Sequence, residues 1–593
     1  MRSFFVIVLL FLGGSAFSQN DLLAKNYFEQ GEFEKALVLY QRLEKQNPGH
    51  TRYLLELVKT HQQLEQFQEA ENLLKERLSG RRTLPQLFVE LGYNYELQEK
   101  DSLAQINYRK AIKSVKEQPA YAYLIGSTFN DYSKLEEAAE VYETAMQLDN
   151  TRDYYPQLAR IYGEQGDLGK MFDTYVSVML KNPAYISTVK RNFSQYITED
   201  PTNEANEMLR KTLLKRLQQD PEVLYNQLLS WLFIQQKDFK KAFIQEKAIY
   251  VRTGENLYGL QDLSQIAIEE ESYGDARDIL EFIIEKADRP SVQLSAHQQL
   301  LQIAIRLAET KDFPAIETTY QKLLQEFGYS SETYLLQIDY NEFLAFKQGR
   351  KEEAITNLKA LSKEPLSVYQ EAWVKLKLSD ILVYDEKFNE ALIYYSQVQN
   401  KVKNDVLAQE ARFKVARTSY FKGDFEWAQT QLDVLKKSAS QLIANDAMQL
   451  SLMIRDNSLE DSTQTALKKF AEADLKELQD KDTEAIAILK DILTSHKGEK
   501  IEDEALLKLG GIYEKIHQYQ KAEAQYLKLI EFYKEDILAD DAHYRLAKLY
   551  DTKLDQPDKA KQFYEQLIFN FEDSIYFVEA RKRYRTLRGD EIN

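Results

Sequence analysis

A repeat of 34 residues constrains this chain more than any other feature of its sequence. It is clearest between residues 85 and 150, where small, large and aromatic side chains recur at that interval. Two antiparallel helices can cross closely only where small side chains remove bulk, and larger side chains then fill the wider space beside the crossing. The period therefore predicts an array of helix pairs. The matching positions are Leu91 and Ile125, Gly92 and Gly126, Tyr95 and Phe129, Ala104 and Ala138, Tyr108 and Tyr142, and Ala111 and Ala145.

The order of these small and aromatic residues resembles the tetratricopeptide repeat (TPR), a helix–turn–helix unit of 34 residues. The resemblance implies an all-α fold, a TPR-type α-solenoid in which antiparallel helix pairs form a right-handed superhelix. The composition agrees with helices, because 20 glycines and 11 prolines make up only about 5% of 593 residues, against a usual share of about 12%. So few turn formers disfavour a β architecture.

A small residue near the start of each second helix marks the register of the units. The marks are mostly 34 residues apart and lengthen to 37 in the middle of the chain. A solenoid tolerates the longer interval because its connecting turns lie at the surface. The predicted marks are Ala36, Ala70, Ala104, Ala138, Met171, Ala242, Ala276, either Ala315 or Ile316, Ala354, Ala391, Ala428, Ala485, Ala522 and Ala560.

The register divides the chain into blocks with two interruptions. In the first, apolar residues keep a helical spacing, and in the second the polar segment 455–462 is predicted to be a loop. The predicted organisation is a signal peptide at 1–18, an N-terminal TPR block at 19–184, a degenerate helix pair at 185–222, a middle TPR-like block at 223–439, an irregular helical or loop segment at 440–482, a C-terminal TPR block with a capping helix at 483–589, and a tail at 590–593.

The N-terminal residues have the pattern of a secretory signal peptide. Arg2 precedes an apolar run from Phe4 to Leu12, and the small residues Ala16 and Ser18 suit cleavage. The run is shorter than the roughly 20 residues that span a bilayer, so cleavage is favoured over a retained anchor. The absence of cysteine excludes disulfides and a lipidated cysteine. We expect an exported protein without a transmembrane segment in the mature chain, periplasmic first, with the cell surface or secretion as alternatives.

The charge balance argues against nucleic acid as a partner. The formal net charge is −17, and no basic stripe follows any helix strongly enough to offset it. An acidic surface repels phosphate backbones, so nucleic-acid binding is disfavoured and the charge mainly promotes solubility.

Residue patterns that carry chemistry are missing. Without cysteine, a zinc site needs clustered histidines, yet the six histidines are scattered and no pair has the HExxH spacing. Asp480, Asp482 and Glu484 imitate the start of a calcium loop, but Ala485 stands where a sharp turn needs glycine. No nucleophile elbow of the G-x-S-x-G type occurs. We therefore predict no catalytic residue, no metal site, no cofactor and no enzyme activity.

The final helix is predicted to have two different faces. Ala580 and Tyr584 lie on an apolar stripe, while Arg581, Lys582, Arg583, Arg585 and Arg588 occupy the remainder. One interpretation is a basic docking patch for an acidic partner or anionic lipid. The favoured interpretation is a capping helix whose outer face must be solvated, with cations near its C-terminus.

Binding function is expected on the concave face, which in TPR proteins is built from the first helix of each unit. Aromatic and mixed polar side chains on a rigid face suit an extended peptide or a partner helix. The alternative is that these side chains pack between units or simply meet water. The predicted partner-binding residues are Lys25, Phe28, Leu55, Lys59, Gln62, Tyr93, Glu96, Tyr123, Ser127, Asn130 and Arg160.

Two further patterns resemble exported bacterial proteins. Residues 564–574, followed by Glu579-Ala580-Arg581, resemble TPR units of Gram-negative envelope proteins, including the periplasmic protein that works with the Tol-Pal system. Short triplets that begin at Asp101, Asp461 and Asp573 resemble O-glycosylation sites of exported Bacteroidetes proteins. The resemblance implies an envelope setting and no particular activity.

Taken together, these patterns favour a non-enzymatic adaptor that holds other proteins of the bacterial cell envelope together. Two alternatives stay open. One is a structural protein that assembles by stacking the ends of the solenoid, and the other, less favoured, is an enzyme with its site in residues 185–222 or 440–482.

Overall fold

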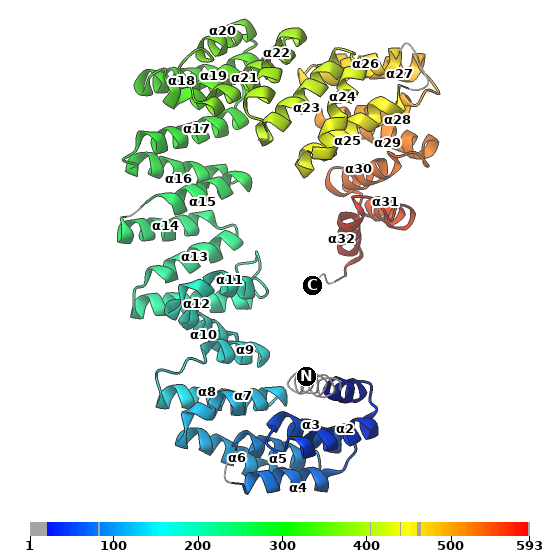
Figure 1. Ribbon diagram of the computed structural model, residues 1–593. Coiled ribbons are helices and arrows are strands. Elements are labelled where there is room, and N and C mark those ends of the chain that lie inside the picture. The colour runs from blue at the N-terminus through cyan, green and yellow to red at the C-terminus, as the bar shows by residue number, and fades with distance from the viewer. Residues whose placement is uncertain are drawn as a thin grey trace, which may run out of the picture. The chain divides into compact units, whose positions relative to one another are not determined.

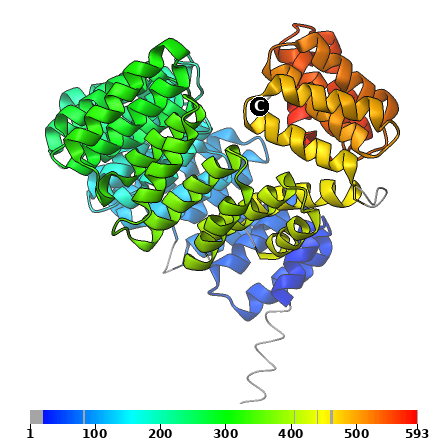
Figure 2. The ribbon, with the colours of Figure 1, turned by 90° about the horizontal axis from the view of Figure 1, so that it is seen from above.

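The computed structural model describes residues 20–80, 84–254, 256–403, 405–438, 440–458 and 464–590. Those residues form helices and turns, with no β-strand among them. The chain divides into two compact units at the boundary between Ile279 and Leu280, and within each unit successive helices lie side by side (Figure 1, Figure 2). The predicted signal peptide and the last three residues of the predicted tail lie outside the described residues.

The first unit is a series of helix pairs, most of them made of a first helix, a tight turn and a second helix, while residues 194–203 form a longer connection between α11 and α12. A helix over residues 20–29 opens the series and pairs with α2. Successive helices contact one another along the unit, as expected for a solenoid. The helices are α2 (Phe33–Gln46), α3 (Thr51–Gln63), α4 (Phe67–Leu78), α5 (Gln86–Glu96), α6 (Asp101–Glu117), α7 (Ala122–Asp131), α8 (Leu135–Leu148), α9 (Tyr155–Glu164), α10 (Leu168–Lys181), α11 (Ile186–Phe193), α12 (Glu204–Gln219), α13 (Val223–Gln235), α14 (Phe239–Thr253), α15 (Tyr258–Glu269) and α16 (Tyr273–Lys286), which crosses into the second unit.

The second unit continues the pattern of pairs, with one additional helix and a final cap. Most of its buried apolar residues form one cluster that extends from Leu294 to Ala580, and a smaller cluster contains Leu506, Leu529 and Ala542. The additional helix, α25, packs against α24, and the next pair begins with α26. The helices are α17 (Pro290–Leu307), α18 (Phe313–Phe327), α19 (Tyr334–Phe346), α20 (Lys351–Leu361), α21 (Val368–Tyr384), α22 (Phe388–Lys401), α23 (Val406–Phe421), α24 (Phe425–Ser438), α25 (Gln441–Asp456), α26 (Thr465–Leu478), α27 (Asp482–Ser495), α28 (Ile501–Lys515), α29 (Tyr519–Phe532), α30 (Ala539–Thr552), α31 (Pro557–Asn570) and α32 (Phe577–Arg588).

The turn inside most pairs has the same backbone geometry. The residue two positions before the second helix has a positive φ, and the next N–H donates to a carbonyl five positions back, as from Lys100 to Tyr95 (3.0 Å). This is the left-handed helix ending that glycine adopts most easily. Several pairs use other residue types there. The residues with positive φ are Gly31, Glu65, Glu99, Ser133, Gly166, Lys237, Glu271, Gly349, Glu386, Gly423, Asp480, His517 and Asp555.

The predicted register marks lie in the core. The alanine marks are fully buried, and Met171 is nearly so. Of the two candidates in one unit, Ile316 is buried and Ala315 is exposed. The all-α solenoid predicted from the 34-residue period is thus confirmed.

The two interruptions of the repeat signature contain helices. Residues 185–222 include α11 and α12, and α12 packs against α10 and α13. Residues 440–482 include α25 and α26. The loop predicted at 455–462 is only partly described: Arg455 and Asp456 end α25, while residues 459–463 lie outside the described part. The block boundaries themselves stay predictions. None of the described helices is long and apolar enough to cross a membrane.

Candidate partner-binding surface

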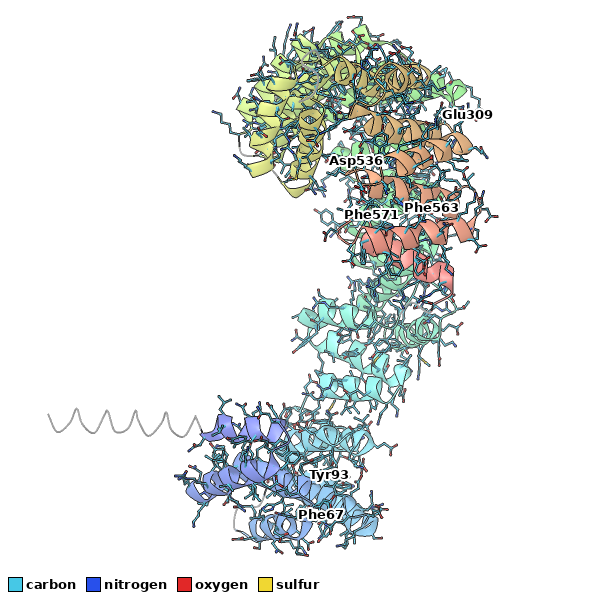
Figure 3. All side chains as sticks on the ribbon, turned by 90° about the vertical axis from the view of Figure 1, so that its right-hand side faces the viewer. Phe67, Tyr93, Glu309, Asp536, Phe563 and Phe571 are labelled. Carbon is cyan, nitrogen blue, oxygen red and sulfur yellow. The ribbon has the colours of Figure 1, made fainter. Side chains whose placement is uncertain are left out.

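The predicted partner-binding residues come from the first helices of the N-terminal pairs. These are the helix over residues 20–29 and α3, α5, α7 and α9, and we call the surface they share the first-helix surface. Helix α5 packs against α4, α6 and α7 and so lies in the middle of the set. Figure 3 marks this region with Phe67 at the start of α4 and Tyr93 on α5.

A buried row of polar side chains runs along α5. Gln86, Glu90 and Asn94 are four residues apart, so they lie on one face of the helix, and each is at most 9% exposed. Buried polar groups need partners, and those of Glu90 and Asn94 come from neighbouring pairs, whereas Gln86 Oε1 has no hydrogen-bond partner among the described residues. Asn94 Nδ2 donates to the Phe67 carbonyl (3.0 Å), and Asn94 Oδ1 accepts from Gln62 Nε2 (3.4 Å). Gln62, predicted to face a partner, is therefore buried between α3 and α5.

Glu90 is held by an aromatic residue from the next pair. Tyr132 Oη donates to Glu90 Oε2 (2.5 Å), and the Tyr132 ring stacks on Tyr93 with centroids 3.8 Å apart. Burial raises the pKa of Glu90 to about 7, although the hydrogen bond from Tyr132 and the charge of Lys59 oppose the rise. A carboxyl group with a raised pKa is thus bonded to Tyr132, one of the two stacked tyrosines.

Glu96 is also committed to contacts within the solenoid. Its carboxylate accepts from Tyr108 Oη (2.8 Å) in the same pair and from Lys134 Nζ (2.5 Å) in the next pair. These bonds join α5 to α6 and to the start of α8. Phe28 similarly packs edge-on against Phe33, with centroids 5.3 Å apart. Both residues are partly exposed, but their main contacts are intramolecular.

The remaining predicted residues leave more of their side chains accessible. Tyr123 is 55% exposed, while Leu55 and Ser127 are half-buried. Asn130 is half-buried too, and its Oδ1 is buried without a hydrogen-bond partner. Each cation pairs with an acid on its own helix: Lys25 with Glu29 (3.6 Å), Lys59 with Glu56 (3.9 Å) and Arg160 with Glu164 (3.6 Å). Such exposed pairs are weak, so a partner can compete for these cations.

Sequence reasoning missed Glu90, Asn94 and Tyr132. The available signal was polar residues at four-residue intervals within the otherwise apolar helix α5, which favours a buried polar seam. Across the described ranges, no group of three His, Asp or Glu side chains is placed to hold a metal ion. At the calcium-like sequence, Lys515 pairs with Asp480 (3.1 Å) and Asp482 (2.9 Å).

Comparison with known proteins identifies the repeat. Residues 27–81 and residues 541–574 match sequence models of the tetratricopeptide repeat. None of the curated proteins matches the chain. The matched segments and the helix pairs together show that the chain contains tetratricopeptide repeats and is an α-solenoid.

Two solved structures match the chain over nearly its whole length at low identity and low TM-score. One is described as the APC/C hetero-tetramer Cut9-Hcn1, with 14% identity, a TM-score of 0.25, and coverage of 97% of this chain and 98% of that chain. The other is Naa15/Naa10 bound to HypK-THB, with 11% identity, a TM-score of 0.25, and coverage of 97% and 96%. Neither likeness is close enough to support an argument about function.

Proposed function

We propose that this chain is a non-enzymatic scaffold for protein–protein interaction in the bacterial cell envelope, which binds a partner peptide or helix on its first-helix surface. The tetratricopeptide repeats support a scaffold, because repeated helix pairs build extended binding surfaces and such folds are generally non-catalytic. The envelope setting is supported by the signal-like N-terminal sequence and by the resemblance of residues 564–574 to Gram-negative envelope repeats.

The observation that carries the proposal is the set of accessible side chains around Tyr123. Tyr123 on α7 is exposed, and Lys59 on α3, the first helix two pairs earlier, is half-exposed. Exposed aromatic side chains of this kind anchor peptides, since the ring supplies apolar area to the contact. Gln62 and Glu96, by contrast, contribute mainly by holding the helices that present them.

Site-specific crosslinking in the native cell tests this assignment. A photo-crosslinking amino acid at position 123 is expected to capture a defined partner, and Lys59→Glu is expected to reduce the yield. Tyr329, which is 70% exposed and lies in the second unit, provides the matched control position. Identical products from positions 123 and 329, or a yield unchanged by Lys59→Glu, would refute the assignment.

The envelope setting needs a separate experiment. Cell fractionation with sequencing of the mature N-terminus is expected to place the protein in the periplasm and to find cleavage near Ser18. Recovery of the uncleaved chain from the cytoplasm would refute export while leaving the scaffold assignment intact.

A further inference from the structure

The cap helix α32 uses one face to hold itself on the last pair. Ala580 is fully buried, and Arg583 donates through Nε (2.9 Å) and Nη2 (2.7 Å) to Asp551 Oδ2 on α30. Tyr584 Oη donates to Glu565 on α31 (2.7 Å). These contacts are sufficient to close the end of a solenoid, so the outer face of α32 has no packing role.

That outer face is basic in a chain that is otherwise acidic. Residues 577–590 contain five basic and two acidic residues, whereas the whole chain has a net charge of −17. Arg581 and Lys582 are exposed and have no ion-pair partner in the described part of the chain. Arg585 and Arg588 both pair with Asp590. The local positive potential therefore favours an acidic ligand at this end of the protein.

A hollow of about 440 Å³ lies beside the basic face, between α31 and α32. Ile568 and Phe569 contribute apolar surface, and Phe569 is 73% exposed. Other rings pack against α30: Phe563 and Phe571, labelled in Figure 3, lie against the His543 ring of α30 at centroid distances of 6.1 and 5.1 Å. The other residues that line the hollow are Arg581, Tyr584, Arg585, Arg588 and Asp590.

We propose that this hollow and its arginines form a second docking surface, which binds an acidic peptide segment of a partner protein with an apolar side chain as its anchor. The hollow accepts the anchor beside Phe569, and the flanking carboxylates pair with Arg581 and Arg585. A concave site fits a protruding side chain better than a flat lipid surface, and a plain cap requires neither a hollow nor an exposed phenylalanine. The surface is independent of the first-helix surface, so either proposal can fail alone.

Fluorescence anisotropy with the full chain tests this surface. The probe is a fluorescein-labelled peptide with one phenylalanine between two pairs of aspartates. Arg581→Glu combined with Arg585→Glu is expected to weaken binding about tenfold or more at low salt, and Phe569→Ala about threefold. Because the charged contacts are exposed, raising salt should weaken binding of the unmodified chain as well.

A charge-matched variant controls for non-specific attraction. Lys113 and Lys116 are exposed on α6, far from α32 in the sequence, and Lys113→Glu combined with Lys116→Glu makes the same change in net charge. This variant should bind the peptide like the unmodified chain, and thermal melts should show that all variants are folded. Equal weakening by both charge reversals, no measurable peptide binding, or preferential binding to vesicles of phosphatidylcholine and phosphatidylglycerol would overturn the proposal.

Discussion

The ring of Tyr108 lies directly against the backbone of Gly92, so that a Cβ atom at position 92 would be 2.4 Å from Tyr108 Cε1. The same relationship recurs in two other pairs. A Cβ at Gly126 would be 2.5 Å from Tyr142 Cζ, and a Cβ at Gly510 would be 2.4 Å from Tyr526 Cε1. Each tyrosine is buried. Glycine at these positions thus makes room for a specific ring from the second helix.

The adjacent residues Gly510 and Gly511 on α28 allow a direct test of this requirement. Gly510→Ala should destabilise the protein by about 2 kcal/mol, because the Tyr526 ring must move. Gly511→Ala meets only the flexible end of Arg545 at 3.3 Å and should stabilise the helix by up to about 1 kcal/mol. Urea unfolding with hydrogen exchange over α28 and α29 measures both effects. Equal losses from the two substitutions would contradict the explanation.

The left-handed turns predict that two substitutions at equivalent positions change the stability of the protein in opposite directions. A Cβ at Gly31 meets nothing within 4 Å, so Gly31→Ala changes only the backbone preference and should cost about 1 kcal/mol. Glu99 has the same conformation (φ 58°), and Glu99→Gly should be stabilising by up to about 1 kcal/mol. Exchange rates of the amides flanking each turn check this. Stabilisation by Gly31→Ala would show that the turn is not strained.

The raised pKa of Glu90 predicts a stability that falls as pH rises. The folded state keeps the proton up to about pH 7, while the unfolded chain releases it near the ordinary pKa of 4.5. Between these pH values the folded state binds more protons than the unfolded state. The contribution of protonated Glu90 to the free energy of unfolding is therefore complete below about pH 4.5. It is lost as pH rises through about 7, by up to about 3 kcal/mol. Glu90→Gln should abolish this loss and be the more stable protein at pH 8, as measured by hydrogen exchange in α5 and α7.

Glu96, on the same helix, provides a control because its contribution to stability depends on pH in the opposite direction. Burial by itself raises its pKa, but the hydrogen bonds from Lys134 and Tyr108 outweigh burial and hold the pKa below its usual value. Its contribution to stability is therefore present above the ordinary pKa and lost as pH falls through the lowered one. Parallel pH profiles for Glu90→Gln and Glu96→Gln would contradict these assignments.

Asn94 is expected to be important for the junction of the second and third pairs. It is fully buried, and Asn94→Ala removes its donor to the Phe67 carbonyl, which should cost about 1–3 kcal/mol. Asn94→Asp should cost more, because a buried carboxylate has no proton to donate there. Melting of both variants, with exchange over α4 and α5, provides the measurement. If Asn94→Ala leaves the stability unchanged, water replaces the amide as the partner of the Phe67 carbonyl.

The ion pair between Arg583 and Asp551 should hold the cap in place. The Asp551 side chain is only 6% exposed, so Arg583→Ala leaves a carboxylate in a poorly hydrated site and should loosen α32 by about 2 kcal/mol, a value reduced by the partial exposure of the arginine. Arg581→Ala, two residues away and without an ion pair, should leave the protection of α32 amides unchanged. Similar protection in the two variants would exclude the anchoring role.

The sequence predicted the scaffold better than the surface. Alanine marks such as Ala104 identify buried positions, because a close helix crossing accepts only a small side chain whatever surrounds it. The burial of the Gln62 side chain depends instead on its contact with Asn94, which lies 32 residues later in the next pair. A pattern within one unit shows which way a side chain faces but not which neighbour binds it. The register marked residues 440–482 as an irregular helical or loop segment, but it could not show that α25 is a single additional helix, since that helix has no place in the repeat.

The recurring left-handed turn has a consequence for how the chain folds. Most pairs are closed by a connection of only a few residues, as between α5 and α6, so the entropy lost in closing them is small and is regained by contacts close in sequence. Low contact order of this kind lets folding begin at any pair and spread to its neighbours. A break in one pair should accordingly remain local, and the pairs beyond it should refold without waiting for the chain ends to meet.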